Sequence, residues 1–226
     1  MRLNLKAKVL SLAVLPVLVF ALIISASTVI MLREQGKREV EETRQHLLAE
    51  AKATLQSYVA VALGTIKPLY DASAPGDMEA RAQVIKMLSQ VTYAKDGYFF
   101  GYDSQAVRLF KGNSPDGIGK SFKDARDPKG VFVNAGLVDV AKAGTHYLEY
   151  SSALPGSSEL VPKLGYTEYL PKWDMAFGSS INLDNIDAKV MELQKNVSER
   201  RQNMLVSIIG ITLLVLLSLI HISEPT

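Results

Sequence analysis

The chain has 226 residues, enough for one or two domains, and 48% of them are apolar while 21% are charged. Its formal net charge is +2, and no basic stripe with interleaved aromatic residues occurs, so nothing in the sequence indicates a nucleic-acid partner. The sequence contains no cysteine, which excludes disulfides, thiolate zinc sites and cysteine nucleophiles.

The first feature along the chain is an apolar run at residues 9–32, "VLSLAVLPVLVFALIISASTVIML", which contains no charged residue. At a rise of about 1.5 Å per residue, this run is long enough to cross a hydrocarbon core of about 30 Å. Arg2, Lys6 and Lys8 precede it, so the positive-inside tendency places residues 1–8 in the cytoplasm. A cleaved signal peptide is the alternative, but its apolar core is normally about 7 to 15 residues long. We therefore expect an uncleaved transmembrane helix.

The segment that follows, residues 33–203, is expected to lie outside the cytoplasm and to begin with helices. Its apolar residues first recur at three- and four-residue steps, which predicts a long amphipathic helix over residues 33 to about 68. Pro68 and the turn sequence "SAPGD" are expected to end this helix. Asp77 then predicts the cap of a second helix over about 77–91.

After Ala94 the hydrophobic period changes from about 3.6 to about 2 residues, which predicts strands. "GYFFGYDS" and "VRLFKG" flank a short polar break, as in a hairpin. A loop rich in Gly, Pro and Asp follows, and Asp127 with Pro128 predicts the start of a helix over 128–143 that Gly144 ends. Three further strands are expected in "THYLEYSSA", "VPKLGYTEYL" and "WDMAFGSSIN". This order predicts an α+β, PAS-like fold with one antiparallel five-stranded sheet flanked by helices.

The chain closes with a predicted helix at residues 183–203 and a second apolar run at residues 204–220, "MLVSIIGITLLVLLSLI". We expect this run to be a second transmembrane helix that is cut short, with the natural protein continuing past residue 219. No basic cluster follows it, and residues 221–226, "HISEPT", are expected to be a non-native tail.

The loop sequence "GNSPDGIGKS" resembles a phosphate-binding loop, but that pattern requires glycine five residues before Gly119, and Ser114 stands there. A turn-forming loop is the better interpretation. The acidic residues of the loop lack the order of a calcium-binding loop, and no histidine pair stands at metal-ligand spacing. No nucleophile with a neighbouring base is recognisable, so we expect no cofactor, metal or catalytic residue, and a binding module is favoured.

The aromatic strand "GYFFGYD" is the strongest candidate for a functional surface. Alternate side chains of a strand share a face, so Tyr98, Phe100 and Tyr102 are predicted to line one side of it. Core packing is the simpler interpretation of such a face, because strands favour aromatic residues. A small polar pocket near Lys111 and Lys163 is the alternative, since buried tyrosine hydroxyls need hydrogen-bond partners.

Three stretches, "DGYFFGYDS", "GIGKSFKDARDPKG" and "YLEYSSALPGSSELVPKLGYTEYLPKWDMAFGSSINLDNID", together resemble the single-Cache sensor domain of bacterial transmembrane receptors, above all methyl-accepting chemotaxis proteins. The resemblance covers about residues 35 to 190. It implies a PAS-like periplasmic domain that binds small ligands, often short organic acids, between the sheet and the loop-helix side. It also implies that the long N-terminal helix pairs with the same helix of a second subunit, in a homodimer.

Carried onto this chain, the resemblance gives a set of candidate ligand-binding residues, to which Lys111 is added as a cation for a carboxylate: Tyr98, Phe100, Tyr102, Lys111, Lys163 and Tyr166. Lys163 and Tyr166 differ in strand parity, so both can face the ligand only if the strand is irregular near Pro162. Lys111-Gly112 stands where many family members have His-Pro, and this departure affects the ligand class.

The resemblance implies the sensory half of a two-pass chemotaxis receptor in the bacterial inner membrane, which is not itself an enzyme. One alternative joins the same sensor to a histidine kinase or a cyclic-dinucleotide enzyme. The other is a membrane-anchored structural domain that binds no ligand.

Overall fold

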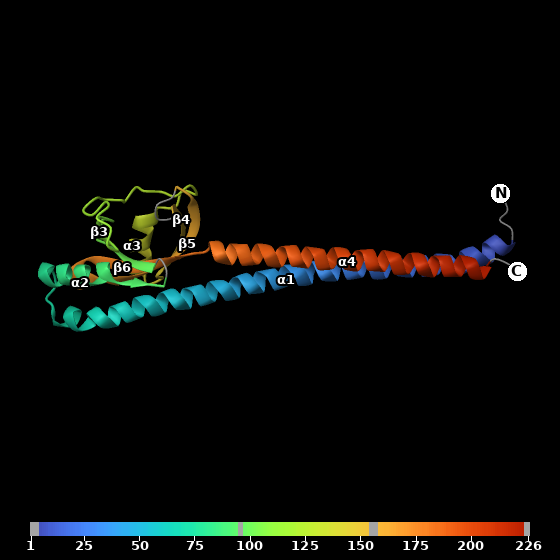
Figure 1. The fold of residues 1–226 in the computed structure, drawn as a ribbon, viewed down its shortest axis with the longest axis horizontal. Coiled ribbons are helices and arrows are strands. Elements are labelled where there is room, and N and C mark those ends of the chain that lie inside the picture. The colour runs from blue at the N-terminus through green and yellow to red at the C-terminus, as the bar shows by residue number, and fades with distance from the viewer. Residues whose placement is uncertain (1–4, 95–96, 154–157, 224–226) are drawn as a thin grey trace. The chain divides into compact units, whose positions relative to one another are not determined.

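A computed structural model of the chain describes residues 5–94, 97–153 and 158–223 (Figure 1). It divides into two compact units, one formed by Met1–Gln45 with Ala188–Thr226 and the other by His46–Asp187. Helix α1, Leu5–Ala72, supplies residues to both units, and most of helix α4, Asp184–Ser223, belongs to the first. Within the described residues, α1 and α4 are the helices long and apolar enough to cross a membrane.

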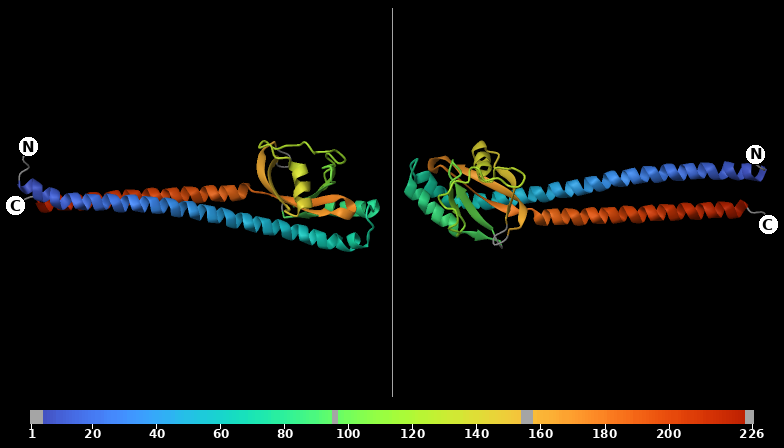
Figure 2. Two further views of the ribbon diagram at one scale, coloured as in Figure 1. Left: turned by 180° about the vertical axis from the view of Figure 1, so that it is seen from behind. Right: turned by 90° about the horizontal axis from the view of Figure 1, so that it is seen from above.

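In the first unit, α1 and α4 lie side by side (Figures 1 and 2). Gly36 is buried at their contact, where a Cβ would collide with the side chain of Val197. An ion pair also joins the two helices, between Nη2 of Arg200 and Oε1 of Glu39 at 2.9 Å. The small residue and the ion pair therefore fix how the helices pack in this unit.

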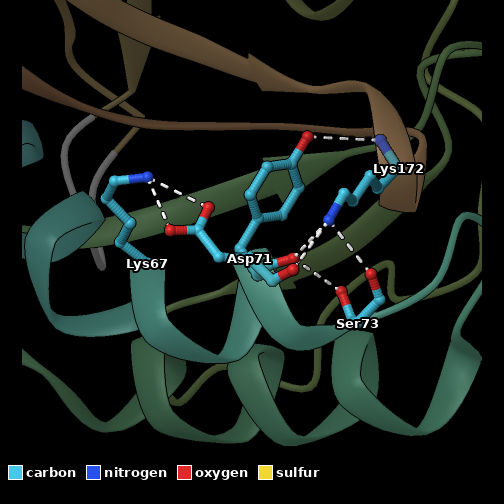
Figure 3. Close-up of polar contacts among 5 residues, drawn as sticks. Lys67, Asp71, Ser73 and Lys172 are labelled. Atoms are coloured by element: carbon cyan, nitrogen blue, oxygen red, sulfur yellow. Dashed lines mark hydrogen bonds and ion pairs between the residues drawn. The ribbon is translucent and has the colours of Figure 1, made fainter.

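The C-terminal part of α1 extends four residues beyond the predicted end at Pro68. A proline this far inside a helix removes one amide donor and is unfavourable, yet α1 continues through Pro68 to Ala72. The end is capped instead by Lys172, whose Nζ donates to the carbonyl oxygens of Tyr70, Asp71 and Ser73 at 3.0, 3.1 and 3.0 Å (Figure 3). An ammonium at this position also complements the negative end of the helix dipole.

Helix α2, Met78–Gln90, begins where the sequence predicts. The side chain of Asp77 accepts hydrogen bonds from the backbone amides of Glu79 and Ala80, at 3.1 and 2.9 Å. The predicted N-cap is confirmed, because a single carboxylate oxygen satisfies two amides that have no partner inside the helix.

The described residues of the second unit form a six-stranded antiparallel sheet. Its strand order is β1-β2-β6-β5-β4, and β3 also pairs with β2. The β2–β3 hairpin and the three later strands are confirmed, whereas the two-residue β1 is too short to leave a pattern in the sequence. The strand bounds are β1 Thr92–Tyr93, β2 Gly97–Tyr102, β3 Arg108–Lys111, β4 Tyr147–Ala153, β5 Leu160–Leu170 and β6 Met175–Asn182, with a 3-10 turn, Pro171–Trp173, between β5 and β6.

Helix α3, Val133–Ala143, starts five residues later than predicted, while its end at Gly144 is confirmed. Asp127 does not cap it. The Asp127 carboxylate instead accepts amide hydrogen bonds from Lys129 and Val131 on its own loop and from Ser151 on β4, each at 2.9 Å. Gly130 has φ +84°, which interrupts any helix there. The Asp-Pro pair therefore fastens a loop to the sheet.

The two faces of the sheet pack against different helices (Figures 1 and 2). One face packs against α1 and α2 around Phe99 and Phe177, and the other packs against α3 around Phe100 and Tyr102. Strand β2 thus sends alternate rings into two separate clusters, as its alternation predicts. The cluster under α3, called the α3 face below, contains Phe100, Tyr102, Leu137, Val138, Ala141, Tyr150 and Ala176.

Candidate ligand-binding site

The structure brings five of the six predicted ligand-binding residues to the α3 face. Phe100 and Tyr102 are buried in its cluster, and Tyr98 packs against it. Lys111 on β3 stands directly opposite Phe100, and Lys163 on β5 stands directly opposite Tyr150 of β4. Directly opposed residues of antiparallel strands share a face, so both lysines lie on the same side of the sheet as the aromatic row.

Both lysines carry positive charges that nearby carboxylates offset only in part. The side chain of Lys163 is 6% exposed, and burial lowers its pKa, as does the neighbouring Lys111, with Asp184 opposing in part. Burial and then Arg108 lower the pKa of Lys111, with Asp116 opposing. Within the part of the chain that the structure describes, neither ammonium has a hydrogen bond or an ion pair. Buried cations without partners are unfavourable, so this arrangement suits an anion supplied from outside.

Arg108 is a third cation at this face, and the sequence analysis missed it. Its guanidinium carbon lies 3.9 Å from the ring centroid of Phe122 and 5.8 Å from that of Tyr102. Nη1 donates to the carbonyl oxygen of Asp116 at 3.0 Å, while Nε is buried without a hydrogen-bond partner among the described residues. Two rings and a carbonyl therefore hold the guanidinium in place and leave a donor unused.

A β-bulge explains why Arg108 could not be found from spacing. Arg108 and Lys111 are three residues apart, which in a regular strand would place them on opposite faces. The register between β2 and β3 shifts, so that Lys111 opposes Phe100 while Arg108 opposes Tyr102. Leu109 is the extra residue of the bulge, so Arg108 and Lys111 lie on the same face of the sheet. An arginine close to an aromatic strand in the sequence only weakly indicates a binding residue, and nothing in the sequence indicates where the bulge lies.

Tyrosine hydroxyls surround these cations. Burial raises the pKa of Tyr102, although Arg108 partly lowers it, and burial together with Tyr102 raises the pKa of Tyr98. Burial also raises the pKa of Tyr150, with the Ser180 side chain opposing. The three phenols stay protonated at neutral pH and can donate hydrogen bonds to a carboxylate. Tyr150 was missed because its proximity to Lys163 arises from strand pairing between β4 and β5.

Tyr166 does not belong to this site, which corrects one of the predicted residues. It packs on the opposite face, in the cluster with α1 and α2, and its hydroxyl donates to Oε1 of Glu168 at 2.5 Å. Strand β5 pairs without interruption from Leu160 to Leu170, so the irregularity near Pro162 that the prediction required does not occur. Strand parity therefore separates Tyr166 from Lys163.

The described residues hold no group of three or more His, Asp or Glu side chains that could bind a metal ion. The α3 face instead combines an apolar cluster with tyrosine hydroxyls and three neighbouring cations, Arg108, Lys111 and Lys163.

Residues 47–196 match the family described as Single Cache domain 2. The chain belongs to the single Cache domain family. The match covers the whole sheet, both of its faces and the helices packed on them, so this Cache domain accounts for the predicted PAS-like fold.

Two curated relatives are similar to most of this chain. The chain is 52% identical to the methyl-accepting chemotaxis protein CtpM of Pseudomonas aeruginosa over 223 residues, which is 98% of this chain and 40% of that protein. It is 28% identical to the sensor histidine kinase MctS of Rhizobium johnstonii, over 82% of this chain and 40% of that protein. The chain thus spans about two fifths of the length of both relatives.

Solved structures agree with this assignment. A methyl-accepting chemotaxis protein from Vibrio parahaemolyticus is 37% identical, with a TM-score of 0.61 over 66% of this chain and 99% of that one. A Cache chemosensory domain described for its carboxylic acid recognition is 24% identical, with a TM-score of 0.55 over 62% of this chain and 97% of that one, and it supports the fold. This Cache domain is therefore of the chemoreceptor sensor kind.

Proposed function

We propose that this chain is the sensing part of an inner-membrane chemotaxis receptor, and that its α3 face binds a short organic acid. The observation that carries the proposal is the group of three cations, Arg108, Lys111 and Lys163, which stand on one face without a carboxylate partner in the described residues. A bound carboxylate would neutralise charge whose burial is otherwise unfavourable.

The cations, the tyrosine hydroxyls and the apolar residues of the α3 face would each contact a different part of such a ligand. Lys163 and Lys111 would bind the carboxylate through charge-assisted hydrogen bonds, and Arg108 would add a fork of donors. The hydroxyls of Tyr98 and Tyr102 would complete its hydrogen bonds. Phe100 and the apolar residues of α3 would contact the carbon chain, which limits the ligand to a small molecule.

The ligand site is connected to α4 through the ends of β5 and β6. Lys163 stands opposite Asn182, and the amide of Leu183 donates to the carbonyl oxygen of Pro162 at 2.8 Å, directly before α4 begins at Asp184. A ligand that favours one arrangement of this junction would shift a two-state equilibrium. In the intact protein that shift would pass along α4 to a cytoplasmic signalling module.

The proposed receptor crosses the membrane twice. Residues 1–8 would lie in the cytoplasm, 9–32 and 204–220 would cross the bilayer, and 33–203 would lie in the periplasm. The length and hydropathy of α1 and α4 and the relationship to chemotaxis receptors support this layout. We propose residues 221–226 as a non-native tail.

Ligand binding is tested with the purified full chain in detergent, by thermal shift against organic acids, amines and amino acids. We expect at least one short organic acid to raise the melting temperature, and Lys163→Ala to abolish that shift. Lys129→Ala, an exposed lysine that is not part of the α3 face, is the matched control and should keep it. A shift that survives changes at Lys163, Lys111 and Tyr102 would place the ligand elsewhere. No shift with any compound would favour a structural domain without a ligand.

A histidine kinase is the second candidate for the whole protein, because MctS shares this sensor. The choice depends on sequence beyond the second apolar run. Sequencing the locus past residue 219 would identify the output domain, and the greater identity to CtpM favours a chemotaxis receptor.

A further inference from the structure

A groove lies between α1 and α4, beside the close contact at Gly36. It encloses about 530 Å3 and is lined entirely by residues of the unit formed by Met1–Gln45 and Ala188–Thr226. Leu32, Val40 and Val197 supply apolar lining. The groove is separate from the α3 face, and the sensing function proposed above does not use it.

The position of the groove along the helices places it at the membrane surface. Arg33 directly follows the apolar run at residues 9–32, and Arg201 comes three residues before the apolar run at 204–220. At a rise of about 1.5 Å per residue, both guanidinium-bearing positions lie within about 5 Å of the ends of the hydrocarbon-spanning segments. Phospholipid headgroups occupy this level.

The charges that line the groove are mostly positive and partly unpaired. Lys37 pairs with Glu34 at 3.2 Å, whereas Arg33 and Arg201 have no ion pair or hydrogen bond among the residues that the structure describes. The neighbouring Arg200, by contrast, is paired with a glutamate of α1. Glu41 also lines the groove and accepts a hydrogen bond from Gln45 at 2.9 Å. Two guanidinium groups from different helices therefore have free donors over one hollow.

We propose that this groove binds the phosphate of an anionic phospholipid, with Arg33 and Arg201 as its ligands. A guanidinium offers a planar fork of donors that matches phosphate oxygens. Leu32, at the end of the first apolar run, would meet the start of the acyl chains. The lipid would bridge α1 and α4 where both enter the membrane.

Native mass spectrometry of the full chain in detergent tests the proposal, with phosphatidylglycerol and phosphatidylcholine added in equal amounts. We expect the protein to retain phosphatidylglycerol preferentially. Because one basic residue near an anionic surface contributes about fivefold in affinity, Arg33→Gln with Arg201→Gln should lower that retention about thirtyfold. Arg33→Lys with Arg201→Lys keeps the charge and should preserve most of it.

The matched control replaces one exposed cation on each helix that does not line the groove, as Arg38→Gln with Lys195→Gln. It should change retention less than about fivefold. An equal loss in this control, or equal retention of the two lipids by the wild type, would overturn the site. Displacement of the lipid by millimolar inorganic phosphate would overturn it as well, since a free anion would then be the ligand. Circular dichroism of each variant confirms that the helices remain folded.

Discussion

Burying the charge of Lys163 destabilises the ligand-free protein, and the proposed ligand would offset this loss of stability. Its folded-state pKa is lowered from 10.5 by burial and by Lys111, so the unfolded chain binds the proton more tightly. The charge therefore reduces stability at neutral pH, and stability is regained as pH rises from the folded-state pKa towards 10.5. Lys163→Met should raise the free energy of unfolding without ligand by about 1 kcal/mol. Urea titration at neutral pH measures this, and a destabilised variant would contradict it.

The pKa shift of Asp127 has the opposite effect on stability to that of Lys163: it stabilises the folded protein at neutral pH. Burial raises its pKa, but the amides of Ser151, Val131 and Lys129 outweigh burial and hold the pKa below 3.8. The carboxylate thus contributes stability that is fully present above pH 3.8 and is lost as pH falls through the lower folded-state pKa. Asp127→Asn should be less stable than wild type at neutral pH, and the gap should close in acid. Urea unfolding of both proteins across the acid range checks this, and a gap independent of pH would contradict it.

At the scale of elements, the turn between β5 and β6 is fastened to the end of α1 by Lys172. Figure 3 shows its ammonium among three carbonyl oxygens. Beside it, the ring of Tyr70 packs edge-on against Trp173, with 4.9 Å between the ring centroids. Hydrogen bonds to a charged group contribute about 1.5 to 3 kcal/mol each when measured singly, and these three share one charge. This contact joins the end of α1 to the turn between β5 and β6, about 100 positions away in sequence.

Removing this ammonium should loosen the end of α1. We expect Lys172→Met to lower the free energy of unfolding by about 2 kcal/mol, because three carbonyl oxygens at the end of α1 lose a charged donor. Lys67→Met is the matched control on α1: its exposed ion pair with Asp71, at 2.7 Å, should contribute less than about 1 kcal/mol. Urea unfolding of the two variants compares them, and equal losses would show that the cap has no special role.

At the scale of the whole molecule, the proposed homodimer concerns the part of α1 that belongs to the second unit. Val61 on α1 is 72% exposed and helps to line an apolar groove of about 620 Å3, whose other lining residues come from α1, α2, β1, β2 and Val91. Apolar surface of this kind on a helix favours a partner helix. We propose that α1 of a second copy packs there.

A charge at this position should prevent the association. Val61→Glu should shift the full chain in detergent from dimer to monomer, as measured by light scattering coupled to size-exclusion chromatography. Lys52→Glu, on the same helix outside this groove, should leave the dimer intact. A monomeric wild type, or a dimer unaffected by Val61→Glu, would contradict the proposed pairing.

Much of this molecule follows from local patterns in the sequence. The apolar runs at residues 9–32 and 204–220, the cap at Asp77 and the alternation of β2 each depend on neighbouring residues, so each was predictable. The aromatic row of the α3 face was predicted for the same reason, whereas Lys111 and Lys163 were proposed as ligand-binding residues with the help of the family resemblance.

The remainder depends on contacts between residues distant in sequence, and these decide the site. A register shift turns Arg108 to the α3 face, strand pairing brings Tyr150 to Lys163, and uninterrupted pairing of β5 keeps Tyr166 away. Asp127 likewise fastens a loop to β4 rather than starting a helix. Sequence by itself determined the long helices, the five longer strands and which face of β2 is aromatic. Only the tertiary structure decided which charges meet on that face, because register and bulges arise from pairing between strands.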